Sequence, residues 1–473
     1  MRYEKNELWK ATLGGMGLGF LSLFLLRKPL INYFHDSVVK RIMVDSYSEN
    51  LWEFVSASTR AGLQPIVENN LRSQEGKVIY RPLGTPRKFL NSDDLLFNIA
   101  QLAKLPTPED RTVNMETVIG PQAARPLQIT MPIMITGMAY GLGLSEKAKI
   151  ALALGATKAG TAINSGEGPF LPSERKAAQH YILMYDRTGR NHNPAVLKQA
   201  DAVEIQFGQG AIAGIGHPTP YASLPPKARK LMGLKPNQPT VTRARQPGIS
   251  DPAKDLPLLV NRLRQITGGV PIGAKIGAGH SLEKDLEILV NAGIDFITVD
   301  GAEAATRGGP PILMDDFGVP TIIAVNRAGN YLQEQGLKGK ITLIASGGLF
   351  APGAFLKAVA LGADAVYIGT AALFAAVHTQ ALKSMPFEPP TQTVFAQGNA
   401  SQKFNVSEGA QSLANFLNSC NLEMIEGIKA LGKTSLREVG KSDLRAVSPF
   451  LAEALDIPLI TESIFAAEAQ MEE

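Results

Sequence analysis

Glycine recurs at the ends of short β-branched runs between residues 131 and 370. A glycine at such an end permits positive φ and lets the backbone approach a ligand closely. Two of these ends, Gly347-Gly348 and Gly369-Thr370, follow the last two runs, and their backbone N–H groups suit a phosphate. The glycines could instead serve tight turns alone, but two adjacent ends of this kind favour phosphate binding.

Lys275 lies inside the apolar run Pro271–Ile276 and is a candidate for chemistry on a cofactor. A lysine that points inward from a buried strand needs a partner of opposite charge. A phosphate-bearing cofactor without metal ligands indicates FMN or pyridoxal phosphate. Lys275 would form a Schiff base with the second, or hold negative charge on the reduced form of the first. A solvent-facing lysine is the less favoured alternative.

These residues need a scaffold that brings strand ends to one face. From Met131 onward short apolar runs alternate with helical stretches, which is typical of a parallel sheet. The expected strands are Pro132–Thr136, Thr157–Ile163, Tyr181–Tyr185, Ala202–Phe207, Pro271–Ile276, Phe296–Val299, Ile341–Ala345 and Ala365–Ile368. Eight strands in about 240 residues predict a closed (β/α)₈ TIM barrel, an α/β fold that binds ligands at the C-terminal ends of its strands. A doubly wound open sheet is the alternative.

Helices are expected between these strands and on both sides of the barrel. The expected helices in the barrel include Ser145–Leu154, Leu256–Ile266, Leu282–Ala292, Thr321–Gln335, Pro352–Leu361 and Ala371–Ala376. One more is expected near Tyr47–Gln64, and a helical C-terminal tail over Ser412–Gly432 and Ser442–Leu455. The connection Gly208–Asp255 is long enough to carry function or inserted structure.

Composition excludes several classes of protein. The 473 residues include 47 basic and 43 acidic residues, a balance that gives no indication of nucleic-acid binding. The single cysteine, Cys420, excludes an intramolecular disulfide, a thiolate zinc site and a cysteine-held iron–sulfur cluster from this chain alone. The six histidines lack the HxxxH and HxH spacings of zinc ligands, so no metal site is predicted.

The segment Ala11–Leu26 is a candidate membrane anchor. Its 16 residues carry no charge and are bracketed by Lys10 and Arg27-Lys28, although a spanning helix wants about 20 apolar residues. A short buried or interfacial helix is the alternative. The downstream positive charge predicts a membrane-anchored protein with its catalytic domain in the cytoplasm. The expected domains are an anchor (1–35), a lead-in (36–125), the barrel (126–380) and a C-terminal helical extension (381–473).

Several separate motifs occur in order over about residues 75–440. From Val118 the chain reads VIGPQAARPLQITMPIMITGMAYGLGLSEKAKIALALGATKAGTAINSGEGPF, and from Leu197 it reads LKQADAVEIQFGQGA. Then follow IGAKIGAG, IDFITVDGAEAATRGGP, ITLIASGGLFAPGAFLKAVALGADAVYIGTAAL and LANFLNSCNLEMIEGIKALGKTSLREVG. Together these motifs resemble the FMN-binding synthase domain of glutamate synthase. The resemblance implies a barrel that binds FMN and decides against pyridoxal phosphate.

The resemblance also implies roles for individual residues. Those implied to bind FMN are Gly137, Met138 and Ala139 along the ring, Asn164 and Gln209 beside it, Lys275 at the N1/C2 edge, and Gly347, Gly348, Gly369 and Thr370 at the phosphate. Glu167 is implied to line the substrate pocket and, with Lys275, to be catalytic. Arg307 is a candidate for a substrate carboxylate, because a guanidinium can bind one bidentately; a surface or phosphate-side arginine is the alternative.

The chain also departs from the family pattern. It has no room for an amidotransferase domain and no cysteine at its start, and the stretch FAAVHTQALKSMPFEPP lacks the family's cluster cysteines. Ile212 and Ile215 replace the lysine and glutamate of the QGAKPGEGG motif. We therefore expect no iron–sulfur cluster. Ammonia would come from solution or a partner chain, and electrons from an electron-donor protein.

Three functions remain open. The first is a membrane-tethered, FMN-dependent oxidoreductase acting on CH–NH₂ donors. It would reduce a 2-iminoglutarate-like imine (2-oxoglutarate plus ammonia) to an amino acid, as in glutamate biosynthesis. The second is an FMN-dependent oxidase or dehydrogenase of another amine or a 2-hydroxy acid, with His217 or His280 as base. The third is a non-catalytic flavoprotein subunit of a membrane redox complex.

Overall fold

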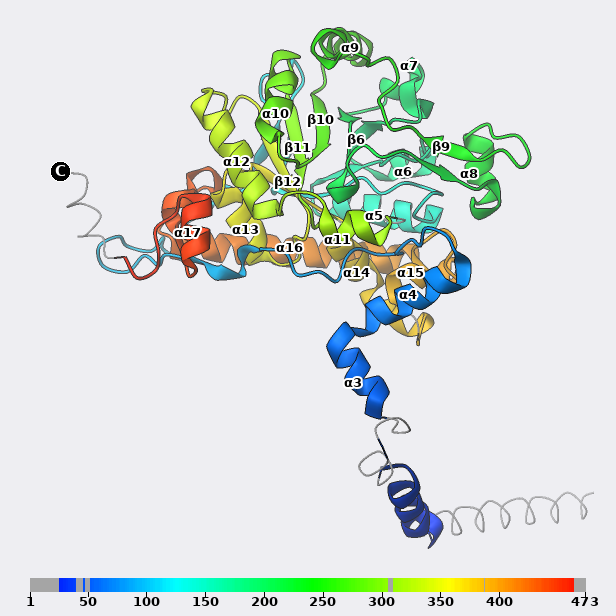
Figure 1. The fold of residues 1–473 in the computed structure, drawn as a ribbon. Coiled ribbons are helices and arrows are strands. Elements are labelled where there is room, and N and C mark those ends of the chain that lie inside the picture. The colour runs from blue at the N-terminus through cyan, green and yellow to red at the C-terminus, as the bar shows by residue number, and fades with distance from the viewer. Residues whose placement is uncertain (1–24, 40–45, 47–51, 305–308, 387, 463–473) are drawn as a thin grey trace, which may run out of the picture. The chain divides into compact units, whose positions relative to one another are not determined.

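The computed structural model describes residues 25–39, 46, 52–304, 309–386 and 388–462. The chain divides into two compact units, Met1–Ile79 and Tyr80–Glu473 (Figure 1). In the first unit a helix over 25–34 continues as a π-helix at His35–Val39, and α3 (Trp52–Ala61) and α4 (Leu63–Glu75) follow. The helical stretch expected near Tyr47–Gln64 is present in its described part as α3, which ends before Gly62 (φ 80°), and α4 begins after that glycine.

Most of the predicted anchor, Ala11–Leu26, lies outside the residues that the structure describes. Among those it does describe, no helix is both long and apolar enough to cross a membrane. The structure therefore gives the predicted anchor no support.

The second unit is built on a closed barrel of eight parallel strands. In order around the barrel the strands are β4 (Ile133–Ile135), β5 (Ala162–Asn164), β6 (His180–Tyr185), β7 (Ala202–Gln206), β10 (Ile272–Gly277), β11 (Phe296–Asp300), β12 (Thr342–Ser346) and β13 (Ala365–Ile368). The last strand closes on the first through the pair Val366–Ile133. The barrel prediction is confirmed and the open-sheet alternative is wrong.

One predicted strand begins too early. Thr157 and Lys158 belong to the last turn of α5 (Glu146–Lys158), and β5 starts only at Ala162. Gly160, at φ 71°, makes the turn between the helix and the strand. The apolar alanines and β-branched residues on both sides of this turn conceal it in the sequence.

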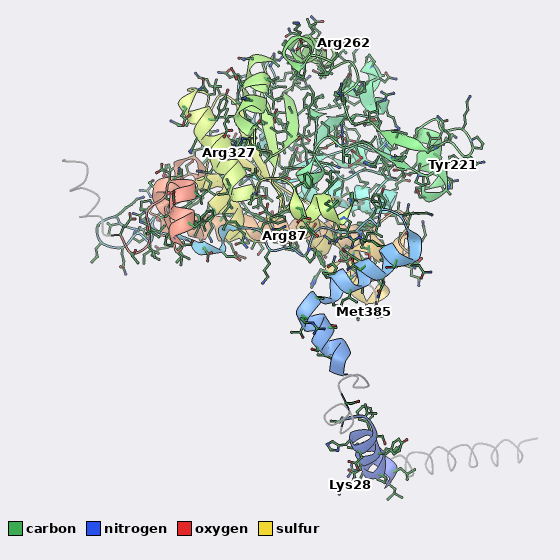
Figure 2. The ribbon with its side chains drawn as sticks, in the orientation of Figure 1. Lys28, Arg87, Tyr221, Arg262, Arg327 and Met385 are labelled. Carbon is green, nitrogen blue, oxygen red and sulfur yellow. The ribbon has the colours of Figure 1, made fainter. Side chains whose placement is uncertain are left out.

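Helices cover the outside of the barrel. They are α5 (Glu146–Lys158), α6 (Pro172–Ala177), α7 (Pro194–Leu197), α9 (Pro252–Thr267), α10 (Leu282–Asn291), α11 (Pro311–Asp316), α12 (Thr321–Glu334), α13 (Pro352–Ala360) and α14 (Thr370–Val377). In α9 the buried residues Leu256, Val260 and Leu263 recur at helical spacing. Arg327 of α12, labelled in Figure 2, makes a bidentate ion pair with Glu283 of α10, and the pair joins neighbouring outer helices.

The connection after β7 carries inserted structure, as its length predicted. It holds a short antiparallel pair, β8 (His217–Thr219) and β9 (Thr240–Thr242), with α8 (Pro226–Leu231) between them. At the other end of the barrel the hairpin of β2 (Thr117–Ile119) and β3 (Leu127–Ile129) packs with the interior residues of the strands.

The C-terminal extension packs on the barrel helices. The long helix α16 (Val406–Ala430) runs along α5, α13 and α14 (Figure 1). A Cβ at Gly155 of α5 would lie 2.8 Å from a Leu413 methyl, so the helices approach closely there. Two short helices, α15 (Pro389–Thr393) and α17 (Pro449–Leu455), flank α16 in sequence.

The helix predicted over Ser442–Leu455 is wrong in its first half. Leu444–Ala446 form β14, which pairs antiparallel with β1 (Leu95–Phe97). A partner strand about 350 residues away in sequence overrides the local helical preference of this segment.

Candidate active site

A cavity of about 1240 Å³ opens at the C-terminal ends of the barrel strands. The predicted site residues that line it are Gly137, Met138, Ala139, Glu167, Gln209, Lys275, Gly347, Gly348, Gly369 and Thr370. Asn164 is fully buried and does not line the cavity. Arg307 lies outside the described residues. Most of the site residues predicted from the strand ends therefore line one cavity.

The loops after β12 and β13 form a cradle that side chains would fill. Gly347 has φ 122°, and a Cβ there would lie 2.6 Å from Thr321 Oγ1. Gly348 has φ 63°, and a Cβ there would lie 2.8 Å from Glu303 Cβ. Both positions therefore require glycine. Thr370 begins α14 beside them, so unpaired N–H groups of a helix start adjoin the cradle.

The loops after β4 and β5 pack backbone against backbone. A Cβ at Gly166 would lie 2.6 Å from the Met138 carbonyl carbon. Lys149 of α5, which is fully buried, donates to Met138 O at 2.7 Å and to Ser165 O at 3.0 Å. The same Nζ lies 2.7 Å from Glu174 Oε1. Burial raises the pKa of the Glu174 carboxyl to about 7, against the attraction of Lys149.

Lys149 was missed in the sequence because it lies among small apolar helix residues that gave no sign of its partner. Its signal was a charge on the barrel-facing side of α5, where Ala148, Ala151 and Leu152 are also buried. The lysine holds the two loops that form one wall of the cavity.

Lys275 has the partner that a buried lysine requires. Its Nζ lies 3.1 Å from Asp300 Oδ2 and 3.3 Å from Thr136 Oγ1, and the two charged side chains are 4% and 3% exposed. Asp300, at the end of β11, also accepts from the Gly210 N–H at 2.9 Å. Asp300 directly follows the expected strand Phe296–Val299, but no role was predicted for it from the sequence.

A second buried carboxylate lies deeper in the barrel. Glu204 of β7 is fully buried and accepts from Asn164 Nδ2 and from Thr298 Oγ1, each at 2.7 Å. Burial raises the pKa of Glu204, while Lys275 acts in the opposite direction. Asn164 therefore points toward Glu204, and its Oδ1 accepts from the Gly166 N–H at 2.9 Å.

Glu167 is held at one wall of the cavity. Its Oε2 accepts from Gln206 Nε2 at 2.9 Å, and its Oε1 accepts from Thr242 Oγ1 at 3.2 Å. His217 Nε2 lies 3.8 Å from the same Oε1. His217 and Thr242 are paired in the β8–β9 register, so the insertion supplies both. His217 lines the cavity, whereas His280 does not.

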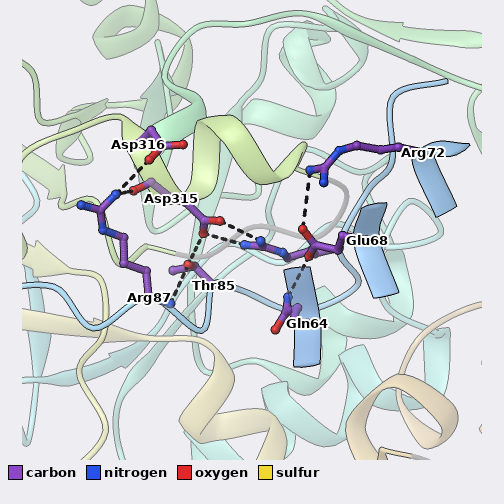
Figure 3. A network of polar contacts seen from close by, with 8 residues as sticks. Gln64, Glu68, Arg72, Thr85, Arg87, Asp315 and Asp316 are labelled. Atoms are coloured by element: carbon purple, nitrogen blue, oxygen red, sulfur yellow. Dashed lines mark hydrogen bonds and ion pairs between the residues drawn. The ribbon is translucent and has the colours of Figure 1, made fainter. Parts of the chain in front are cut away.

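The segment just before the barrel also lines the cavity, which the sequence did not indicate. Arg81 binds Asp315 of α11 through two bonds of 2.6 and 2.7 Å, and Thr85 donates to the same carboxylate (Figure 3). Arg87 binds Asp316 at 2.9 Å. Within the described ranges no cluster of three or more His, Cys, Asp or Glu residues suits a metal ion.

The chain has relatives among known proteins. Residues 87–434 match the family model described as a conserved region in glutamate synthase. The chain is 30% identical over 398 residues to a glutamate synthase large subunit-like protein of Rhizobium meliloti, covering 80% of this chain and 89% of that one. It is 35% identical over 267 residues to an archaeal-type glutamate synthase (NADPH) of Thermotoga maritima, covering 56% of this chain and 51% of the relative.

The chain thus spans about half the length of the archaeal-type relatives that it matches. Among solved structures, a mutant of an active chimera of (S)-mandelate dehydrogenase matches with a TM-score of 0.50. The identity is 13%, over 75% of this chain and 88% of that one. At this identity the structural match shows the fold alone.

Proposed function

Because the chain belongs to the glutamate synthase family, we propose that it is an enzyme that reduces a 2-iminoglutarate-like imine, formed from 2-oxoglutarate and ammonia, to an amino acid. Family membership and the barrel support the broader assignment, an FMN-dependent oxidoreductase. The observation that carries the proposal is one cavity that combines a glycine cradle, a buried lysine and a fixed carboxylate.

The residues of the cavity fit FMN. Its volume of about 1240 Å³ exceeds the range of about 300–1,000 Å³ usual for ligand pockets, which leaves room for a cofactor and a small substrate. The cradle at Gly347 and Gly348 leaves space at the backbone that a phosphate can occupy, beside the first turn of α14. Lys275 of β10 supplies a fixed cation at the cavity wall.

Each residue then has a proposed task. The glycines of the cradle, with Gly369 and Thr370, bind the phosphate; Gly137, Met138 and Ala139 line the ring; and Gln209 donates to it. Bound FMN supplies hydride transfer. Lys275 stabilises negative charge where it develops. Asn164 does not reach the cavity; its Oδ1 accepts from the Gly166 N–H and so holds the loop after β5 in place.

Glu167 and His217 carry the proton chemistry in this proposal. Gln206 and Thr242 hold the Glu167 carboxylate in place, and His217 faces it across 3.8 Å. The pair can hold a proton beside the nitrogen of an imine and release it as the amine forms. Arg307, outside the described residues, remains the proposed partner of a substrate carboxylate.

The broader organisation is also a proposal. We propose an N-terminal membrane anchor and a cytoplasmic catalytic domain, with the domain boundaries 1–35, 36–125, 126–380 and 381–473. Electrons come from a donor protein. The chain's single cysteine, Cys420, is buried in α16, so the proposal includes no iron–sulfur cluster.

A second candidate function rests on His217. A histidine beside a carboxylate at the cavity wall is the kind of base that oxidation of a 2-hydroxy acid requires. In that reaction His217 would accept a proton from the substrate hydroxyl. The barrel and the cofactor would be the same, and only the substrate would differ.

The flavin spectrum of the purified full chain separates these candidates. Bleaching by glutamate, or reoxidation of the reduced protein by 2-oxoglutarate with ammonia, supports imine reduction. Bleaching by a 2-hydroxy acid alone supports the second candidate. A bound flavin that responds to no amino acid, oxo acid or hydroxy acid contradicts both. A protein that takes up no FMN contradicts the cofactor assignment itself.

A further inference from the structure

The ion pair of Lys275 with Asp300 changes the charge that the cavity presents to a cofactor. The Nζ–Oδ2 distance is 3.1 Å, and both side chains are almost completely buried. Two opposite charges this close, away from water, largely cancel each other's field at longer range. The edge of a bound ring would therefore face an ion pair, and the partner that the sequence required for Lys275 is Asp300.

Asp300 is held firmly in this position. It ends β11, in register with Gly277 of the neighbouring strand β10. Its Oδ2 accepts from the Gly210 N–H at 2.9 Å, and its backbone carbonyl accepts from the Ala278 N–H at 2.8 Å. Moving the carboxylate away from Lys275 would break the first of these bonds. The ion pair is therefore a built feature of the strand ends.

Lys275 is the cation that balances this carboxylate. The second oxygen, Oδ1, is buried and receives no hydrogen bond from the part of the chain that the structure describes. With no donor of its own, this oxygen leaves the Lys275 ammonium, 3.1 Å from Oδ2, as the main electrostatic partner of the carboxylate. Thr136 and the ring of Tyr367, 6.0 Å from Nζ, also lie beside the lysine.

The other nearby carboxylate, Glu204, is a weaker counter-ion. It is fully buried, and two hydrogen-bond donors, Asn164 and Thr298, already share its charge. Burial also raises the pKa of Glu204, which shifts it toward the neutral acid. Asp300 is therefore the group whose charge decides how much of the lysine's field reaches the cavity.

We propose that Asp300 is a positioning residue that compensates Lys275 and so lowers the reduction potential of the bound flavin. This inference rests on the proposed FMN site. Reduction places negative charge on the flavin ring, and a neighbouring cation favours that charge. A carboxylate that cancels the cation disfavours it. A lower potential makes the reduced flavin a stronger hydride donor, so the pair favours reduction of an imine over oxidation of an amine.

The test is the midpoint potential of FMN in the full chain carrying Asp300→Asn. Asparagine has the same shape, and its side-chain oxygen can still accept from Gly210, so the loop is retained. We expect the affinity of the protein for reduced flavin, relative to its affinity for oxidised flavin, to rise on the order of tenfold. For a two-electron couple this corresponds to a midpoint potential about 30 mV higher. Sulfite, which forms an anionic adduct with the ring, should bind about tenfold more tightly, by the same change of charge.

Two further variants make the result specific. Asp300→Glu keeps the charge and should leave the potential close to that of the unmodified chain. Asp364→Asn removes a carboxylate that pairs with Lys338 at 2.6 Å, at the opposite end of β13 from the cavity, and should leave the potential unchanged. A potential for Asp300→Asn that is unchanged or lower would overturn the inference while the FMN assignment stands. An unmodified chain that binds no FMN would overturn the proposed function instead.

Discussion

Replacing Lys149 by methionine should destabilise the barrel in a way that depends on pH. The Lys149 Nζ lies within 3.0 Å of two loop carbonyls and of Glu174, and neither charged side chain is more than 1% exposed. Methionine keeps most of the side-chain volume but removes the charge and the donors. Breaking a buried ion pair from one side typically costs about 3–5 kcal/mol, and we expect a loss of that order above pH 7.

The pH dependence follows from Glu174. Burial raises the pKa of this carboxyl from its ordinary value of 4.5 to about 7, even with Lys149 beside it. A raised carboxyl pKa in the folded state means that stability falls as the pH rises from the unfolded value to the folded one. The unmodified chain stops losing stability from this group near pH 7. Without Lys149 the pKa of Glu174 rises further. The free energy of unfolding of the variant should therefore keep falling above pH 7, by roughly 1.4 kcal/mol for each pH unit, until the pH reaches the new pKa.

Urea unfolding followed by circular dichroism at pH 6, 7 and 8.5 measures this difference. Lys147→Met is the matched control, because Lys147 lies on the same helix and its Nζ donates at the surface, to Gln402 O. Its stability should change by about 0.5 kcal/mol or less. A gap between the Lys149 variant and the unmodified chain that stays constant from pH 6 to pH 8.5 would refute the reasoning about Glu174.

Three other substitutions test the cavity. Gly348→Ala places a Cβ 2.8 Å from Glu303 Cβ at a residue of positive φ, so the loop must shift. FMN affinity, measured by fluorescence titration, should fall at least about tenfold. An unchanged affinity would argue against phosphate binding at the cradle. His217→Asn should lower turnover by about 10²-fold while FMN affinity is retained, and normal turnover would remove His217 from the proton chemistry. Arg81→Met loses two hydrogen bonds to Asp315 and should lower the free energy of unfolding by about 2 kcal/mol. A change below about 0.5 kcal/mol would show that this contact does not stabilise the fold.

The sequence predicted the barrel well because its strands are marked by two signals at once. Each is a short β-branched run, and most end at glycine or a small polar residue, so the expected and observed strands mostly agree within one or two residues. The exception is the expected strand Thr157–Ile163, whose first residues belong to α5. Where a helix made of alanine and threonine runs into a strand, composition does not mark the boundary.

The candidate site was predictable where it depends on the backbone at strand ends. Gly347, Gly348 and Lys275 were found because their types are unusual in their local context. The pairing of Lys275 with Asp300, by contrast, joins β10 to β11 through barrel geometry that no local pattern encodes. The same holds for His217, which reaches Glu167 only because of the hairpin that the insertion forms.

A single-turnover experiment tests the central claim most directly. The flavin of the full chain is reduced without oxygen and mixed with 2-oxoglutarate and ammonia, while flavin absorbance and amino-acid formation are followed together. The proposed function predicts that reoxidation requires both compounds and that one amino acid forms for each flavin reoxidised. Reoxidation by 2-oxoglutarate alone, or a reduced flavin that stays reduced in the presence of both, would contradict it.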